Sequence, residues 1–168
     1  MGTSVLADAF GHHIWATIRL IDSCADVPSE QLEVTVPGTF GSILGTLRHL
    51  VDADASYLHV ISGQRVLMAD HSGDDLDGLR SAMEAHGVDW QRVLEDGLDP
   101  TEVVVRHRDD GSESHAPLGI RIAQVLHHGT DHRSQVCTAL TNLGVEPPEI
   151  DVWDFGWSDG RVVEFHSD

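Results

Sequence analysis

Apolar side chains recur every three or four residues along much of the chain, which is the spacing of one face of an α-helix. The segments with this spacing are residues 5–23, 42–62, 72–94 and 118–143. Ser42 and Ser72 stand where helix N-caps are favoured, and Gly63 and Gly144 stand where helices commonly end. The pattern therefore predicts four long helices, enough for a bundle.

The period of the pattern changes to two between residues 102 and 117. Residues 103–106 and 112–116 flank an Asp-Gly pair, a dipeptide that favours a tight turn between antiparallel strands. We therefore expect a small β-hairpin before the last long helix. The predicted fold class is all-α, an up-down four-helix bundle with this hairpin as an insertion.

The length of 168 residues suits one domain, and the sequence contains no internal repeat. The Pro-Pro pair at 147–148 is too short a break to separate two domains. The tail beyond it carries Trp153, Phe155 and Trp157, three of the few aromatic residues of the chain. Because tryptophan is mostly buried, we expect a single domain over residues 1–168, with the tail of about 145–168 packed on the bundle.

The charge balance narrows the range of functions. Ten Lys and Arg residues stand against 28 Asp and Glu residues, so the formal net charge is −18. Nucleic acids and anionic membrane surfaces attract clustered Lys and Arg, so neither is an expected partner. No stretch reaches the roughly 18 apolar residues of a membrane span, and no secretory signal is visible at the N-terminus. Two cysteines make no disulfide framework, and the expected location is the cytoplasm.

The chain holds 12 histidines, and two of them form the strongest candidate site. His128 and His132 are four residues apart, which places both imidazoles on one face of a helix. They continue the apolar stripe of the last helix, so both point into the predicted bundle. Either each ring finds hydrogen-bond partners in the core, or the pair binds a divalent metal, for which His-x-x-x-His on a helix supplies two ligands without strain.

Other helices supply further candidate residues for such a site. His49 is the best placed third histidine, because it lies inside the second predicted helix at the edge of the apolar stripe. Asp54 lies on that stripe and is a pocket candidate; the alternative is a polar residue of the core held by a cap or by water. His13, in the first predicted helix, is a second pocket candidate. His127 is about 100° from His128 around the helix and is expected at the periphery.

Two blocks of the sequence resemble the DinB-like (YfiT-like) metalloenzyme superfamily. Residues 42–54 read Ser-Ile-Leu-Gly-Thr-Leu-Arg-His-Leu-Val-Asp-Ala-Asp, and residues 128–135 read His-Gly-Thr-Asp-His-Arg-Ser-Gln. They are similar to the family pattern of one histidine in the second helix and a His-x-x-x-His-Arg-x-Gln block in the last. The chain departs from the family at Asp131, where many members have another histidine, and at Ser134, where glycine or alanine is common.

The resemblance implies a bundle that is often a homodimer and that binds a divalent metal, variously zinc, nickel or iron. Carried over residue by residue, the ligands are His49, His128 and His132. Some relatives are metal-dependent thiol transferases or isomerases, which implies an enzyme that activates a low-molecular-weight thiol for attack on an electrophilic small molecule, or a hydrolase that activates water. The catalytic residues stay undefined beyond the pocket candidates Asp54 and His13. The alternatives are a non-catalytic, stress-associated, dimeric metal-binding bundle, and a metal-free bundle with hydrogen-bonded histidines.

Overall fold

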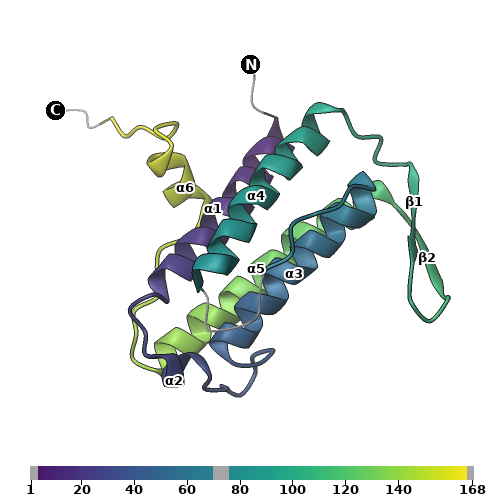
Figure 1. The fold of residues 1–168 in the computed structure, drawn as a ribbon. Helices are drawn as coiled ribbons and strands as arrows, with labels where there is room; N and C mark the ends of the chain where they lie inside the picture. The colour runs from purple at the N-terminus through teal and green to yellow at the C-terminus, as the bar shows by residue number, and fades with distance from the viewer. Residues whose placement is uncertain (1–3, 70–75, 166–168) are drawn as a thin grey trace.

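Four long helices form the body of the protein in the computed structural model, which describes residues 4–69 and 76–165 (Figure 1). The long helices are α1 (Val5–Ser23), α3 (Ile43–Ser62), α4 (Leu76–Glu95) and α5 (Leu118–Asn142). The short elements are the helices α2 (Ser29–Leu32) and α6 (Val152–Ser158) and the antiparallel strands β1 (Val103–His107) and β2 (Glu113–Pro117). The predicted four-helix bundle with a hairpin before the last long helix is confirmed. Residues 72–75 of the third predicted helix lie outside the described residues.

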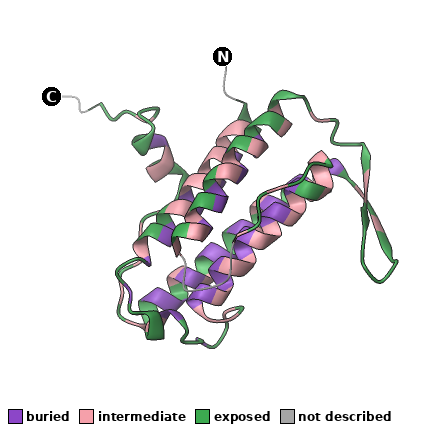
Figure 2. Ribbon diagram, in the orientation of Figure 1, coloured by how far each residue is buried: buried purple, intermediate pink, exposed green. Residues whose placement is uncertain are grey.

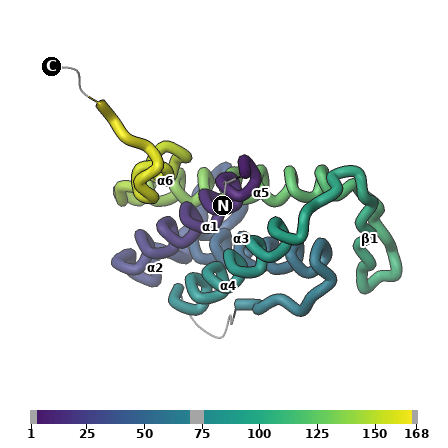
Figure 3. Tube along the Cα trace, turned by 90° about the horizontal axis from the view of Figure 1, so that it is seen from above, coloured from purple at the N-terminus to yellow at the C-terminus, as the bar shows by residue number. Residues whose placement is uncertain are grey.

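The long helices are arranged so that α1 and α3 face each other across the bundle. Each of these two helices packs against both α4 and α5. The chain runs in one direction along α1 and α5 and in the opposite direction along α3 and α4, a detail that the hydrophobic pattern does not contain (Figures 1 and 3). Helix α3 is therefore antiparallel to its neighbour α5, and the middle of one lies beside the middle of the other.

Short polar residues and glycine determine where the helices begin and end. Ser4 Oγ accepts a hydrogen bond from the backbone N–H of Ala7 at 3.0 Å, and Ser42 Oγ accepts one from the N–H of Gly45 at 3.0 Å. Gly63 follows α3 with a φ of 67°, in the left-handed region that favours glycine. The predicted N-cap at Ser42 and C-cap at Gly63 are confirmed.

The core consists of two apolar clusters with polar side chains between them. Most of the buried residues lie on the four long helices (Figure 2). The cluster toward α2 includes Leu20, Leu47, Met83 and Leu140. The cluster toward the hairpin includes Phe10, Leu58, Trp90 and Ile122. The buried polar residues between them, here called the polar layer, are His13, Thr17, Asp54, His86 and Arg133. Among the described residues, no helix is both long enough and apolar enough to cross a membrane.

Helix α6 packs against α1, on the side of the bundle away from the hairpin (Figure 3). Gly11 makes room for it, because a Cβ atom at this position would lie 3.0 Å from Cζ of Phe155. The Phe155 ring also lies 5.7 Å from the ring of Trp15, measured between centroids. Trp153, Trp157 and Phe165 are exposed, so Phe155 is the aromatic residue of the tail that faces the bundle.

Gly129 allows α1 to approach α5 closely, and its replacement tests this packing. A Cβ atom at this position would lie 2.5 Å from Cε1 and from Nδ1 of His13. We expect Gly129→Ala to lower the free energy of unfolding by about 1–3 kcal/mol, the range for overpacked cores, despite the better helix propensity of alanine. Urea unfolding followed by circular dichroism measures the loss. Gly41→Ala is the control, because nothing lies within 4 Å of its Cβ position; an equal loss in both variants contradicts the prediction.

Candidate metal centre

Three histidines from α3 and α5 meet where these two helices pack together. His49 lies on α3, and His128 and His132 lie one turn apart on α5. The ring centroid of His49 is 5.0 Å from that of His128 and 4.7 Å from that of His132. The centroids of His128 and His132 are 4.4 Å apart. The structure thus brings together the three residues that the sequence suggested as ligands.

The ring nitrogens of the three histidines have the spacing that a shared ion requires. Nε2 of His49 lies 3.1 Å from Nε2 of His128, and each of the three residues offers one nitrogen within 4.8 Å of the others. Two imidazole nitrogens bound to one ion at about 2.0–2.1 Å with tetrahedral angles lie about 3.3–3.4 Å apart. The donor type and the spacing therefore fit three ligands of a divalent metal, with further coordination positions left over.

The surroundings favour the neutral form of two of these rings, which is the form that binds metal. Burial, and then the neighbouring His132 and His49, lower the pKa of His128 to about 4, because burial and a second positive charge nearby both disfavour the charged ring. Burial and then the proximity of His132 lower the pKa of His49. At neutral pH each of these rings therefore keeps one nitrogen lone pair available.

Two aromatic side chains border the three histidines. The ring of Phe40 stacks on His49, with centroids 4.2 Å apart and planes inclined by 20°, and it meets His132 edge-on at 5.1 Å. Tyr57 meets His128 edge-on at 5.7 Å. Phe40 lies in the connection before α3 and is 57 % exposed, so it forms an outer wall of the site, here called the Phe40 wall.

Phe40 and Gln135 both lie at the site, although the sequence pattern predicted no role for either of them. Phe40 belongs to an irregular segment, where hydrophobic periodicity carries no information. Gln135 lies one turn after His132 and contacts both His132 and Phe40. Gln135 is the last residue of the His-x-x-x-His-Arg-x-Gln block, which is the feature of the sequence that pointed to it. The block does not predict which residues Gln135 contacts.

The two pocket candidates, Asp54 and His13, lie together inside the polar layer. Nε2 of His13 is 3.0 Å from Oδ1 of Asp54, and their side chains are only 2 % and 1 % exposed. Both carboxylate oxygens of Asp54 accept from the indole N–H of Trp90 at 3.1 Å. Nδ1 of His86 lies 3.1 Å from Oδ2, as an ion pair rather than an aligned hydrogen bond. Side chains from α1 and α4 thus surround a carboxylate of α3.

The donors and acceptors of the polar layer fix the positions of its protons. Nη1 of Arg133 lies 2.9 Å from Nδ1 of His13; because a guanidinium only donates, Nδ1 accepts and Nε2 holds the proton directed at Asp54. Nε2 of His86 lies 2.7 Å from the carbonyl oxygen of Leu67, which only accepts. Nδ1 of His86 faces the Asp54 carboxylate, which favours a proton on this nitrogen as well and therefore the imidazolium form of the ring.

These contacts shift the pKa values of the polar layer in opposite directions. Burial by itself raises the pKa of Asp54, but hydrogen bonding to His13 and the contact with His86 outweigh burial and lower it to about 2. Burial opposes the charge on His86, but the carboxylate of Asp54 and the carbonyl of Leu67 outweigh it and raise the pKa. Burial lowers the pKa of Arg133 to about 10, so its guanidinium is charged at neutral pH.

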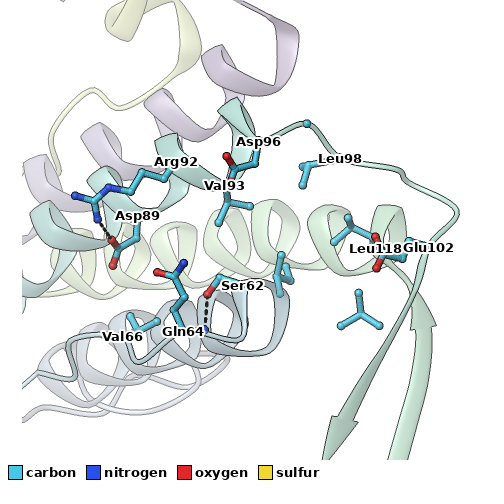
Figure 4. A pocket seen from close by; sticks show the side chains of 13 residues that line it. Ser62, Gln64, Val66, Asp89, Arg92, Val93, Asp96, Leu98, Glu102 and Leu118 are labelled. Carbon is cyan, nitrogen blue, oxygen red and sulfur yellow. Dashed lines mark hydrogen bonds and ion pairs between the residues drawn. The ribbon is translucent and has the colours of Figure 1, made fainter.

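Two cavities open elsewhere on the bundle. One, of about 230 Å³, lies between the last turns of α3 and α4 and the hairpin, with Asp89, Asp96 and Glu102 among its lining residues (Figure 4). The other, of about 530 Å³, is lined mostly by apolar residues of α1 and α5 and reaches His127. The three clustered histidines line neither of them. His127 is exposed, as its position on the helix predicted.

Comparisons with known proteins identify what this chain is similar to. The sequence model of the DinB family matches residues 1–163. The chain is similar to the crystal structure of a DinB-like protein from Bacillus cereus ATCC 10987, with a TM-score of 0.65 and 16 % sequence identity over 90 % of this chain and 100 % of that one. At this level of identity the likeness shows the fold. No curated protein matches the sequence.

The charges of the polar layer predict how stability depends on pH. Because the pKa of His86 is raised in the folded state, His86 contributes stability below its unfolded pKa of about 6.5, and this contribution is lost as the pH rises through the folded pKa. Asp54, whose pKa is lowered to about 2, contributes stability above its unfolded pKa of about 3.9 and loses it as the pH falls. The joint contribution is therefore largest between about pH 4 and 6.5.

We expect His86→Gln to cost about 3–5 kcal/mol of unfolding free energy in that window, because it breaks a buried ion pair, and less at alkaline pH. Urea unfolding of the variant and the wild type from about pH 4 to 9 measures the difference, which isolates His86 from other titrating groups. His107→Gln is the control, because His107 is 74 % exposed on the hairpin. A cost for His86→Gln that stays constant with pH would show that the ring is not an imidazolium.

Proposed function

The chain belongs to the DinB family, and from this premise we propose that it binds a divalent metal ion through His49, His128 and His132. The observation that carries the proposal is the convergence of one nitrogen from each ring within 4.8 Å. The lowered pKa values of His128 and His49 support it, because a neutral imidazole binds metal without first losing a proton. Three imidazoles suit zinc, nickel or iron, and the proposed ion belongs to this group.

We further propose that the centre serves an enzyme. A divalent ion held by neutral imidazoles lowers the pKa of a bound thiol or water and so supplies a nucleophile at neutral pH. Phe40 and Tyr57 place apolar rings beside the histidines and exclude water on those sides. The proposed activity is transfer of a low-molecular-weight thiol to an electrophilic small molecule, as a thiol S-transferase or isomerase, or hydrolysis when water takes the place of the thiol.

Asp54 and His13 support the centre from inside the core in this proposal. The ring of His13 lies against Gly129, the residue after His128, and Asp54 holds that ring by a hydrogen bond at 3.0 Å. These contacts fix the side of α5 that faces α1. The adjacent side, which carries His128 and His132, is thereby directed toward α3.

A second candidate function is a non-catalytic, stress-associated metal-binding bundle. The observation that favours it is that the three histidines come from two different helices. An ion bound there joins α3 to α5 and stabilises the folded state without any reaction. Under both functions we propose a cytoplasmic homodimer. The net charge of −18 is consistent with small-molecule ligands rather than nucleic acid or anionic membranes as partners.

Removal of a single ligand tests the metal site. We expect His49→Ala, His128→Ala and His132→Ala each to weaken metal binding by more than about 100-fold, since even residues that only support a ligand cost about 10–100-fold. Elemental analysis of the purified proteins, followed by titration with Zn²⁺, measures the stoichiometry and the affinity. His127→Ala is the matched control, an exposed histidine on the same helix. Unchanged stoichiometry in the three variants would refute the site.

A thiol-dependent reaction tests the enzymatic proposal. We expect the metal-loaded protein to consume a chromogenic electrophile at least about tenfold faster than the metal-free protein, in the presence of glutathione, mycothiol or bacillithiol, because the ion increases the thiolate fraction. His128→Ala should react like the metal-free protein and His127→Ala like the wild type. If the wild type binds metal but shows no turnover with any thiol or with hydrolysable esters, the non-catalytic function takes precedence.

A further inference from the structure

A single oxygen atom connects two parts of the candidate metal centre that are far apart in the sequence. Oε1 of Gln135 accepts a hydrogen bond from the backbone N–H of Phe40 at 2.9 Å, across 95 residues of chain. The same oxygen lies 3.2 Å from Nδ1 of His132. Gln135 is half-buried on α5, one turn after His132, so it lies between this histidine and the connection that carries the Phe40 wall.

The Phe40 N–H determines which end of the Gln135 amide faces the site. A backbone N–H can only donate, so the amide atom opposite it is the carbonyl oxygen and not the NH₂ group. A carbonyl oxygen can only accept, so Nδ1 of His132 must carry the proton that points at it. The neutral ring then has its lone pair on Nε2. In this tautomer His132 offers Nε2 to a metal, as His49 and His128 do with the nitrogens that face each other at 3.1 Å.

We propose that Gln135 is a positioning residue that holds His132 in its metal-binding tautomer and, through the same oxygen, holds the Phe40 wall against the centre. The inference rests on the proposed function of the three histidines as a metal site. It adds that ligand orientation and the position of the wall are linked. A carbonyl oxygen has two lone pairs and serves both donors at once, so loss of this oxygen releases the ring and the wall together.

Metal binding and the hydrogen bond that holds the Phe40 wall in place should therefore strengthen each other. A histidine bound to metal through one nitrogen is a better donor through the other, and a hydrogen-bonded partner there orients the ring and raises its basicity. The Phe40 ring covers His49 and the edge of His132 while its backbone is held by Gln135. By linkage, an ion that strengthens the hydrogen bond from His132 to Gln135 also stabilises the position of the Phe40 segment, which Gln135 holds.

The first test uses the metal-free protein and measures the two hydrogen bonds directly. Long-range ¹⁵N–¹H NMR correlations of the His132 ring should show the proton on Nδ1 in the wild type. Hydrogen exchange of the Phe40 amide should be at least about tenfold faster in Gln135→Leu than in the wild type. Gln135→Glu keeps the acceptor oxygens and should restore both signals. A proton on Nε2 of His132 in the wild type, or unchanged Phe40 exchange in Gln135→Leu, overturns the inference.

The second test measures metal affinity by titration with Zn²⁺ against a chromophoric chelator. We expect Gln135→Leu to bind about 10–100-fold more weakly than the wild type, the usual effect of removing the partner of a metal-binding histidine, and Gln135→Glu to bind at least as tightly. Gln91→Leu is the matched control, because Gln91 is exposed on α4 and bonds to Glu95. Wild-type affinity in Gln135→Leu overturns the inference.

The two tests separate this inference from the proposed function. If the wild type binds no Zn²⁺, the metal site fails, but the His132 tautomer and the Phe40 exchange still decide whether Gln135 holds the ring and the wall. If the wild type binds Zn²⁺ and Gln135→Leu matches it in either experiment, the metal site stands and the role of Gln135 is rejected. Circular dichroism and urea unfolding establish that the variants are folded, and the measurement of the tautomer in the wild type needs no variant.

Discussion

A buried carboxylate constrains the packing of the whole bundle. Asp54 lies in the middle of α3 and is stable as an anion only where His13 of α1 and His86 and Trp90 of α4 all reach it. The two apolar clusters, toward α2 and toward the hairpin, are less selective, because apolar cores tolerate many repacked arrangements. A buried ion pair that loses one partner costs about 3–5 kcal/mol, so a helix that slides by one turn past Asp54 is strongly disfavoured. The polar layer therefore selects the register among otherwise similar apolar packings.

The same constraint reaches the candidate metal centre through α5. Arg133 donates to Nδ1 of His13 and to Oγ1 of Thr17, and Gly129 lies against the His13 ring, so one side of α5 is fixed against α1. His128 and His132 each precede one of these residues, and a step of one residue turns a helix by about 100°. Their rings are therefore directed to the neighbouring side, where α3 presents His49. The packing of the two helices that brings the three histidines together therefore follows from contacts of other residues, and the ring nitrogens of the histidines only orient the rings.

Much of this arrangement could be predicted from the sequence, and the remainder has identifiable physical causes. The helices follow from apolar spacing and from caps such as Ser42 and Gly63, and the pairing of His128 with His132 follows from helix geometry. Partners across the bundle could not be predicted in the same way, because they depend on helix directions that the pattern does not record. The contacts of Asp54 with α1 and α4 could not be predicted for this reason. The Phe40 wall and its bond to Gln135 lie in an irregular segment, where position depends on a single hydrogen bond across 95 residues.

Asp54 and His49 lie less than two helical turns apart on α3, but their sites have opposite electrostatic requirements. Asp54 is an anion surrounded by N–H donors, and it needs no ion from outside. At the three histidines the balance is reversed, because His132 presents a lone pair on Nε2 and the Nε2 atoms of His49 and His128 face each other at 3.1 Å. One proton between His49 and His128 leaves the lone pair of His132 unused, and the lowered pKa values of His49 and His128 make a second proton unfavourable. A single cation would accept all three lone pairs at once. In the proposed metal site this positive charge comes from solution, whereas the polar layer supplies its counter-charges from its own side chains.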